Sequence, residues 1–216
     1  MNKLFESINR ALEFPLGSKA RILLAAAVFG LVAALLLPLW SFWMTAPGES
    51  GALRLDIYST GLAAGNRGAD LPRINGLGRG LGLAELASAR FSEFQWMPFV
   101  IGALALVVLR AAILGKMSHL LDTAVLFFYF CLFAIWTFGH RLYAYGHDVI
   151  SVTGAGVSPF MPPMAGGRTI GGIEIQASPS FGAYALVAAG LFLAAAVALS
   201  WRDEEREHAA DSRVCD

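Results

Sequence analysis

The sequence predicts an all-α membrane protein with four transmembrane helices and a small outward-facing loop domain that contains a short β-sheet. The 216 residues are 56% hydrophobic and only 15% charged, with a mean hydropathy of +0.60. This composition is too apolar for an ordinary soluble domain. Four apolar stretches each reach the length of about 20 residues that a helix needs to cross the hydrocarbon core.

The net charge argues against a nucleic-acid-binding protein, and the positions of the two cysteines argue against disulfide-stabilised loops. The 16 basic and 16 acidic residues cancel, so no overall field draws the protein to nucleic acid, and we expect no nucleic-acid partner. Cys131 lies inside an apolar stretch and Cys215 lies next to the C-terminus. The polar loops therefore have no disulfide framework and need a core of their own.

The first predicted span covers residues 22–44, which carry no charge. It ends in Trp40, Phe42 and Trp43, a pattern typical of an aromatic belt at the membrane interface. A cleaved signal peptide is the competing interpretation. The apolar stretch is too long for one and Pro47 would follow the cut, so we expect an uncleaved anchor.

The other spans are predicted at 97–114, 120–143 and 181–201. The second has Arg110 near one end, where its long side chain can reach the interface. The third is crowded with aromatic residues, which we expect to face lipid or a partner. The fourth is rich in alanine and carries Gly190. Because small residues let helices approach closely, we expect it to lie deepest in the bundle.

Short basic segments predict the orientation. They precede the first span and flank the turn between the second and third spans, at Lys3, Arg10, Lys19, Arg21, Arg110 and Lys116. The positive-inside rule assigns such segments to the cytoplasm. We therefore expect a bacterial inner-membrane protein that has both termini in the cytoplasm and its two long polar loops outside.

The remaining segments follow from this orientation. Residues 1–21 have apolar positions at helical spacing and predict an amphipathic segment on the cytoplasmic side. Residues 202–216 are dominated by charge and predict a solvated cytoplasmic tail. The outer loops are then 45–96 and 144–180, and the cytoplasmic turn between the second and third spans is 115–119.

Local patterns in the outer loops predict their structure. Residues 53–58 alternate apolar and polar side chains as a strand does, and 169–175 is its predicted partner in a small sheet. The glycine-rich stretch 61–82 predicts tight turns. Residues 83–94 predict an amphipathic helix that leads into the second span. The proline-rich stretch 158–164 predicts a rigid, extended chain.

Several motifs in these loops resemble those of one family. They are Arg-Leu-Asp-Ile-Tyr at 54–58, Gly-Asn at 65–66, Asp-Leu-Pro-Arg-Ile-Asn at 70–75, Glu-Phe-Gln-Trp-Met-Pro-Phe at 93–99, Tyr-Gly-His-Asp at 145–148 and Pro-Phe-Met-Pro-Pro at 159–163. The family comprises small polytopic bacterial membrane proteins from gene neighbourhoods for nitrous oxide reductase maturation and periplasmic copper handling. The resemblance covers roughly residues 50–185. It implies a role beside a periplasmic metalloenzyme or copper protein.

The chain departs from this family in one segment. After Ile74 and Asn75 the family pattern has Asn-His-Tyr with a methionine shortly afterwards, which would offer an imidazole and a thioether to a soft metal. Here the segment is Gly78-Arg79-Gly80-Leu81-Gly82-Leu83. Arg79 has no lone pair to give and Leu83 has no donor atom, so these ligands are missing in this chain.

Four other residues are candidate metal ligands: His140, His147, Met161 and Met164. Cu(I) favours thioether donors together with imidazole, so copper is the candidate cofactor. The alternative is that the methionines pack as adaptable apolar contacts and that His147, next to Asp148, caps a turn. The spacing alone does not decide between these interpretations.

Enzymatic and transport functions find little support in the residues. The alternating glycines Gly76, Gly78, Gly80 and Gly82 follow no strand-to-helix dinucleotide pattern. No serine or cysteine stands in a recognisable setting with a histidine and a carboxylate, so we expect a protein that is not an enzyme. The middles of the predicted spans contain no aspartate, glutamate, lysine, arginine or histidine, which argues against an ion path.

The leading hypothesis is a non-enzymatic accessory membrane protein whose periplasmic loops dock a partner in metalloenzyme maturation or copper handling. Its expected surroundings are the lipid bilayer and another membrane or periplasmic protein. One alternative is a structural subunit of a larger membrane complex that uses the aromatic third span as its contact surface. The other is a metal-binding or transport component that uses His147, Met161 and Met164.

Overall fold

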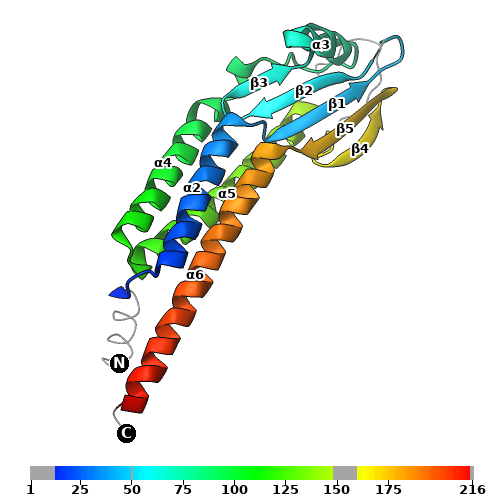
Figure 1. The fold of residues 1–216 in the computed structure, drawn as a ribbon. Coiled ribbons are helices and arrows are strands. Elements are labelled where there is room, and N and C mark those ends of the chain that lie inside the picture. The colour runs from blue at the N-terminus through cyan, green and yellow to red at the C-terminus, as the bar shows by residue number, and fades with distance from the viewer. Residues whose placement is uncertain (1–12, 50, 148–159, 215–216) are drawn as a thin grey trace. The chain divides into compact units, whose positions relative to one another are not determined.

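The computed structural model describes residues 13–49, 51–147 and 160–214, and side chains as far as residue 207. Within these ranges four helices are long and apolar enough to cross a membrane. They are α2 (Ser18–Leu36), α4 (Glu93–Leu114), α5 (Met117–His147) and α6 (Phe181–Val214) (Figure 1). The predicted class, a four-helix membrane protein with a small sheet, is confirmed.

The chain divides into two compact units, which are described separately. The helix unit consists of the described residues of Met1–Ala33, Val100–Cys131 and Ala185–Asp216, and the sheet unit consists of those of Ala34–Phe99 and Leu132–Tyr184. The helix unit therefore contains the N-terminal part of α2 and α5 and the C-terminal part of α4 and α6.

Small residues bring helices together in the helix unit. A Cβ atom on Gly30 would lie 2.9 Å from the carbonyl oxygen of Ala185 and 3.1 Å from Cβ of Ala189, so only glycine lets α2 and α6 approach this closely. Gly190 likewise lies against the ring of Phe127 on α5, 2.9 Å from the position that a Cβ would take. The fully buried side chains around these contacts are mainly aliphatic: Leu24, Leu31, Ile101, Leu104, Val108, Leu120 and Leu193.

The segment before α2 pairs with the turn between α4 and α5. Pro15 and Lys116 form an antiparallel bridge. The Leu16 amide donates to the Gly115 carbonyl at 2.7 Å, and the Met117 amide donates to the Phe14 carbonyl at 3.0 Å. These bonds satisfy backbone groups at the end of α4 and the start of α5 that have no partner inside either helix.

The sheet unit contains a five-stranded antiparallel sheet in the order β3-β2-β1-β5-β4 (Figure 1). Its strands are β1 (Trp40–Thr45), β2 (Leu53–Tyr58), β3 (Gly61–Ala64), β4 (Gly166–Ile170) and β5 (Ile173–Pro179). The strand predicted at 53–58 is therefore present as β2. Gly171 and Gly172, with φ angles of 56° and 82°, form the turn between β4 and β5. Two successive positive φ angles are what a two-residue hairpin turn requires, and glycine adopts them without strain.

One face of the sheet is buried and apolar. Side chains alternate along each strand, so Phe42, Leu55 and Ile175 point to this face. It is covered by Ile74 of helix α3 (Asp70–Gly80), by Leu81, Leu83 and Phe160, and by partly buried residues of α5 that include Phe138 and Leu142. The opposite face carries polar side chains and Trp43, and the candidate site lies there.

The sheet is joined to the adjoining ends of two helices by very short connections. β1 begins four residues after the last residue of α2, and Ser180 alone separates β5 from α6. The Gly182 amide donates to the Pro38 carbonyl at 2.8 Å, and the Ser180 amide donates to the Leu39 carbonyl at 3.0 Å. The segment between α2 and β1 is therefore hydrogen-bonded to Ser180 and to the start of α6.

The boundary predicted for the first span is wrong. Helix α2 ends at Leu36 rather than continuing to residue 44, and residues 40–45 form the central strand β1. Pro38 disfavours the helical conformation for the residue before it, and aromatic side chains suit a strand. Trp40, Phe42 and Trp43 are thus sheet residues and not the predicted aromatic belt at a helix end.

The glycine-rich stretch is also more regular than predicted. Residues 61–82 include β3 and the helix α3. Glycine costs a helix up to about 1 kcal/mol per residue, but burial of Ile74 against the sheet offsets part of this cost. No α-helix forms over 83–94 before Glu93, and the range contains only the short 3-10 helix η2 (Ser88–Arg90). The Asn75 side chain accepts from the Leu86 amide at 2.8 Å and donates to the Leu86 carbonyl at 3.1 Å. These bonds occupy the backbone amide and carbonyl of Leu86, which in an α-helix would bond to other residues of the same helix.

Two further expectations differ from the structure. Residues 53–58 and 169–175 do not pair, because β1 lies between β2 and β5. The charged tail is helical as far as Val214. The expectation that the fourth span lies deepest in the bundle stays a prediction. Residues of α6 make close contacts with Gly30 and Phe127, and its fully buried residues are Ala189, Leu193, Ala196 and Ser200.

Other boundaries shift slightly or lie outside the described residues. α4 begins at Glu93, α5 extends from Met117 to His147, and only Gly115 and Lys116 separate them. Residues 160–163 have no regular structure, while 158 and 159 lie outside the described ranges. Of the amphipathic segment predicted at 1–21, residues 1–12 also lie outside them, and residues 18–21 form the start of α2.

Candidate functional site

The four predicted metal ligands lie along the end of α5 and the chain beside it. The Phe160 amide donates to the Gly146 carbonyl at 3.1 Å, so Met161 follows directly after a contact with the residue before His147. The sulfur of Met164 lies 3.9 Å from the position that a Cβ on Gly139 would take, next to His140 in the sequence. The segment thus runs beside the last two turns of α5, where both histidines lie.

The two histidines are separated along the helix. His147 lies seven positions after His140, which is about 10 Å of α-helix. The Nδ1 atom of His147 lies 2.9 Å from the Tyr143 carbonyl oxygen, and its ring stacks on Tyr143 with centroids 3.8 Å apart. Nδ1 donates this bond, because a carbonyl oxygen can only accept. Both histidines are exposed. The metal site stays a prediction.

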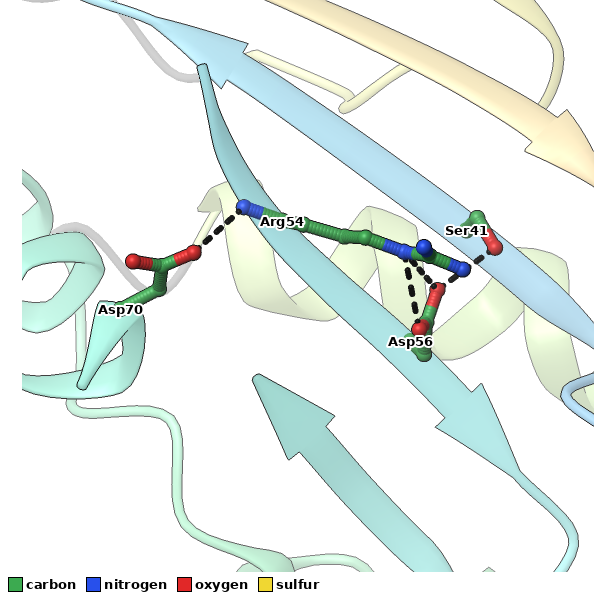
Figure 2. A network of polar contacts seen from close by, with 4 residues as sticks. All are labelled: Ser41, Arg54, Asp56 and Asp70. Carbon is green, nitrogen blue, oxygen red and sulfur yellow. Dashed lines mark hydrogen bonds and ion pairs between the residues drawn. The ribbon is translucent and has the colours of Figure 1, made fainter. Parts of the chain in front are cut away.

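A network of polar contacts orders the opposite, open face of the sheet (Figure 2). Ser41 and Asp56 are partners across β1 and β2, and the Ser41 hydroxyl donates to the Asp56 carboxylate at 2.7 Å. Arg54 is two residues from Asp56 on the same face of β2, and its Nε lies 2.9 Å from Oδ2 of that carboxylate. Asp56 is thus shared by a hydroxyl and a guanidinium, and its side chain is only 13% exposed.

Asp70 ties the same strand to helix α3. It is the first residue of α3 and is almost completely buried. Its Oδ2 accepts a hydrogen bond from the Arg54 amide at 3.1 Å (Figure 2). Its Oδ1 accepts one from the Asn66 side chain at 2.8 Å. Gly65 packs against the same carboxylate, in a space too small for any side chain. Asp70 therefore holds the backbone of Arg54 in place from the start of α3.

Trp43 is the large exposed side chain of this face. It faces Arg54 across β1 and β2, and the Arg54 Cζ atom lies 4.9 Å from the centre of the indole ring. A cation at this distance is attracted by the face of the ring. The side chain of Arg54 remains 41% exposed, and Trp43 is 40% exposed. We call this pair the Trp43–Arg54 surface.

A shallow depression of about 420 Å³ adjoins Trp43. Its lining residues are Trp43, Gly166, Gly167, Gln176, Ala177 and Ser178. Gly167, Gln176 and Trp43 form one row across β4, β5 and β1. Because Gly167 has no side chain, the depression reaches the backbone of β4. The Gln176 amide nitrogen donates to the Glu174 carboxylate at 3.2 Å, which turns that side chain along its own strand.

This arrangement is suited to recognition. Tryptophan and arginine are the residue types most enriched among those that dominate binding energy at protein interfaces. The described residues contain no group of three or more histidine, cysteine, aspartate or glutamate side chains that could hold a metal ion. Sequence reasoning missed Trp43 and Arg54 as a pair, because the apolar Trp43 on the outward face breaks the alternation of residues 40–45 that would have predicted β1.

Comparison with protein-family models, with curated proteins and with solved structures gives no match to this chain.

Proposed function

We propose that this chain is a non-enzymatic accessory membrane protein whose sheet docks a partner protein. The observation that carries the proposal is the Trp43–Arg54 surface, in which an exposed arginine is held over an exposed tryptophan by Asp56. The sheet presents this pair on the face that the protein's own core does not cover.

The fixed conformation of the Arg54 side chain supports a binding role for this surface. A free arginine side chain loses about 2 kcal/mol of rotamer freedom when it is fixed. Here Asp56 and the indole ring restrict the guanidinium before any partner arrives, so less freedom is lost on binding.

The membrane side and the class of partner belong to the same proposal. Lys19, Arg21, Arg110 and Lys116 favour a cytoplasmic position for the helix ends near them. The sheet is then periplasmic and both termini are cytoplasmic, in the inner membrane of a bacterium. The family resemblance supports a partner that takes part in metalloenzyme maturation or copper handling. The partner carries the metal chemistry, and this chain contributes the docking surface.

The test is cross-linking of the tagged full-length chain in its native membranes, followed by identification of the cross-linked protein. We expect one partner to be lost with Trp43→Ala and with Arg54→Ala. The matched control is Trp136→Ala, because Trp136 is an exposed tryptophan of α5, 73% exposed, outside the sheet. Loss of the partner with Trp136→Ala but not with Trp43→Ala would contradict the proposal and favour a structural subunit that packs through α5.

A further inference from the structure

Strand β4 is the open edge of the sheet. Among the described residues β4 pairs only with β5, and its first four residues, from Gly166 to Thr169, are all exposed. The other edge, β3, is partly covered, because the Leu62 amide donates to the Ser88 hydroxyl at 3.2 Å. An edge strand presents a row of backbone groups that can pair with another extended chain.

The register shows which groups of β4 point outward. Ile170 and Ile173 close the two-residue turn and therefore form a hydrogen-bonded pair. Because bonded and non-bonded pairs alternate in an antiparallel ladder, Arg168 also bonds to β5, while the amides and carbonyls of Gly167 and Thr169 point away from it. Within the described ranges, no backbone group accepts from or donates to these outward groups.

The depression beside Trp43 lies next to this edge. Gly167 is in its lining and in the same cross-strand row as Gln176 and Trp43. A residue of an added strand opposite Gly167 would project over this bare backbone. Aromatic side chains cover glycines in this way across strand pairs, and an aromatic ring there could also contact the indole of Trp43.

Arg168 presents a positive charge to an added strand, at the position next to the one opposite Gly167. It is exposed, its guanidinium donates to the Met161 carbonyl at 3.3 Å, and it forms no ion pair with a described residue. An acidic residue opposite it would be favourable, since opposite charges facing each other across strands stabilise the pair.

The same arginine disfavours a second copy of this chain. If β4 paired with β4 of another copy through the outward groups of Gly167 and Thr169, each Arg168 would face the other copy's Arg168. The Cα atoms of such a pair lie about 4.5 Å apart, and like charges directly opposite each other destabilise the sheet. The occupant that fits is therefore a different protein.

We propose that the β4 edge binds an extended, antiparallel segment of the partner in which an acidic residue immediately precedes an aromatic one. The acidic residue faces Arg168 and the aromatic residue covers Gly167 beside Trp43. The order follows from the antiparallel direction, in which residues opposite Thr169, Arg168 and Gly167 succeed one another from the N-terminus of the segment. This inference rests on the proposed docking function and names the form of the docked segment.

The probe is a blocked, dye-labelled peptide with the sequence Thr-Val-Thr-Glu-Phe-Thr, titrated against the detergent-purified full-length chain by fluorescence anisotropy. We expect saturable binding. We also expect binding to weaken about fivefold when the phenylalanine is replaced by alanine or the glutamate by lysine, because one cross-strand pair contributes up to about 1 kcal/mol. Equal binding of all three peptides would overturn the proposed sequence preference.

A pair of variants at Thr169 tests the backbone bonds. Thr169→Pro removes an outward N–H at an edge position where proline is tolerated, and Thr169→Ala keeps that N–H. We expect the proline variant to lose peptide binding and the alanine variant to bind within about twofold of wild type, because the side chain at 169 adds only a small pair term. Unchanged hydrogen exchange at the amides of Phe42 and Leu55 would show that the sheet remains folded.

Two further measurements test the backbone pairing without the Thr169→Pro variant. N-methylation of the peptide's phenylalanine removes the amide that would donate to the Gly167 carbonyl, and we expect binding to be lost with the protein unaltered. Protection of the Gly167 and Thr169 amides from exchange in the protein alone would overturn the inference, because the edge would already be paired. If cross-linking at the Trp43–Arg54 surface succeeds while the peptide fails to bind, the docking function stands and only this inference fails.

Discussion

At the scale of single residues, Asp70 has the largest structural role in the candidate site. Its two carboxylate oxygens accept bonds from the Arg54 amide and the Asn66 side chain, and almost none of it is exposed. A buried carboxylate with these partners links a strand to the start of a helix. The helix also favours a negative charge at that end.

Asp70→Ala should therefore destabilise the sheet unit. The substitution leaves the buried Arg54 amide and the Asn66 side chain without their acceptor, at a cost of about 1–3 kcal/mol for each unsatisfied group. Hydrogen exchange of the β2 amides should show a loss of opening free energy in this range. Glu174→Ala, at an exposed position of β5, is the control and should leave the exchange of β2 unchanged. An equal effect of both substitutions would contradict this role for Asp70.

The separation of the candidate ligands along α5 makes a prediction about copper. Tight Cu(I) binding requires several soft donors at one point, and here Met161 and Met164 approach different ends of a helical segment about 10 Å long. We expect the purified wild-type chain and the triple variant His147→Ala, Met161→Leu, Met164→Leu to have the same Cu(I) stoichiometry and affinity. Tight binding that the variant loses would contradict this expectation and favour a metal-handling role.

At the scale of elements, the close approach of α2 and α6 depends on Gly30. Gly30→Ala places a Cβ within 3.1 Å of both the Ala185 carbonyl and Ala189, which forces the helices apart and should destabilise the helix unit by about 1–3 kcal/mol. Gly102→Ala is the matched control, because no atom lies within 4 Å of its added Cβ. In α4 that change should be neutral or stabilise by up to about 1 kcal/mol.

Unfolding of the two variants in mixed micelles, followed by loss of helical signal, measures both effects. Gly30→Ala should unfold at a lower denaturant fraction than wild type, and Gly102→Ala should not. If both variants unfold like wild type, the contact between α2 and α6 is not as close in solution as the structure shows.

The elements also show how far sequence reasoning reaches. The alternation of residues 53–58 is visible because its apolar and polar positions differ, and β2 is present there. In β1 the outward positions include Trp43, so apolar side chains stand on both faces and the strand merges with the preceding span. The helix α3 contains three glycines, and tertiary packing of Ile74 overrides their low propensity.

The candidate site could not be predicted from the sequence for a related reason. Trp43 and Arg54 meet only because β1 and β2 pair in one register, and Gly167 joins their face through two further pairings. Such pairings are non-local, and a shift of one residue would move each side chain to the opposite face. Local sequence patterns carry no information about strand register. In the sequence, the histidines and methionines stand out instead, because metal-binding side chains are recognisable without knowing which strands pair.

At the scale of the whole molecule, the orientation in the membrane is open to a direct test. In a chain with Cys131→Ser and Cys215→Ser, single cysteines are introduced at the exposed positions Glu174 and Arg202. We expect an impermeant maleimide to label Glu174→Cys in intact spheroplasts, and Arg202→Cys only after lysis, because the basic segments favour a cytoplasmic position for both termini. The reverse pattern would place the sheet in the cytoplasm and contradict a periplasmic partner.

The short connections between the sheet and two helix ends have a consequence for how the protein tolerates insertions. β1 and β5 are neighbours, and one follows α2 closely while the other leads into α6 after a single residue. An added residue in the loop between β1 and β2 can bulge into solvent without changing any register. An added residue at Ser180 has no such freedom, because it must either break the Ser180–Leu39 and Gly182–Pro38 bonds or turn the start of α6 by about 100°. Variation in length among related chains should therefore be found in the loops of the sheet and not at the junctions where strands become helices.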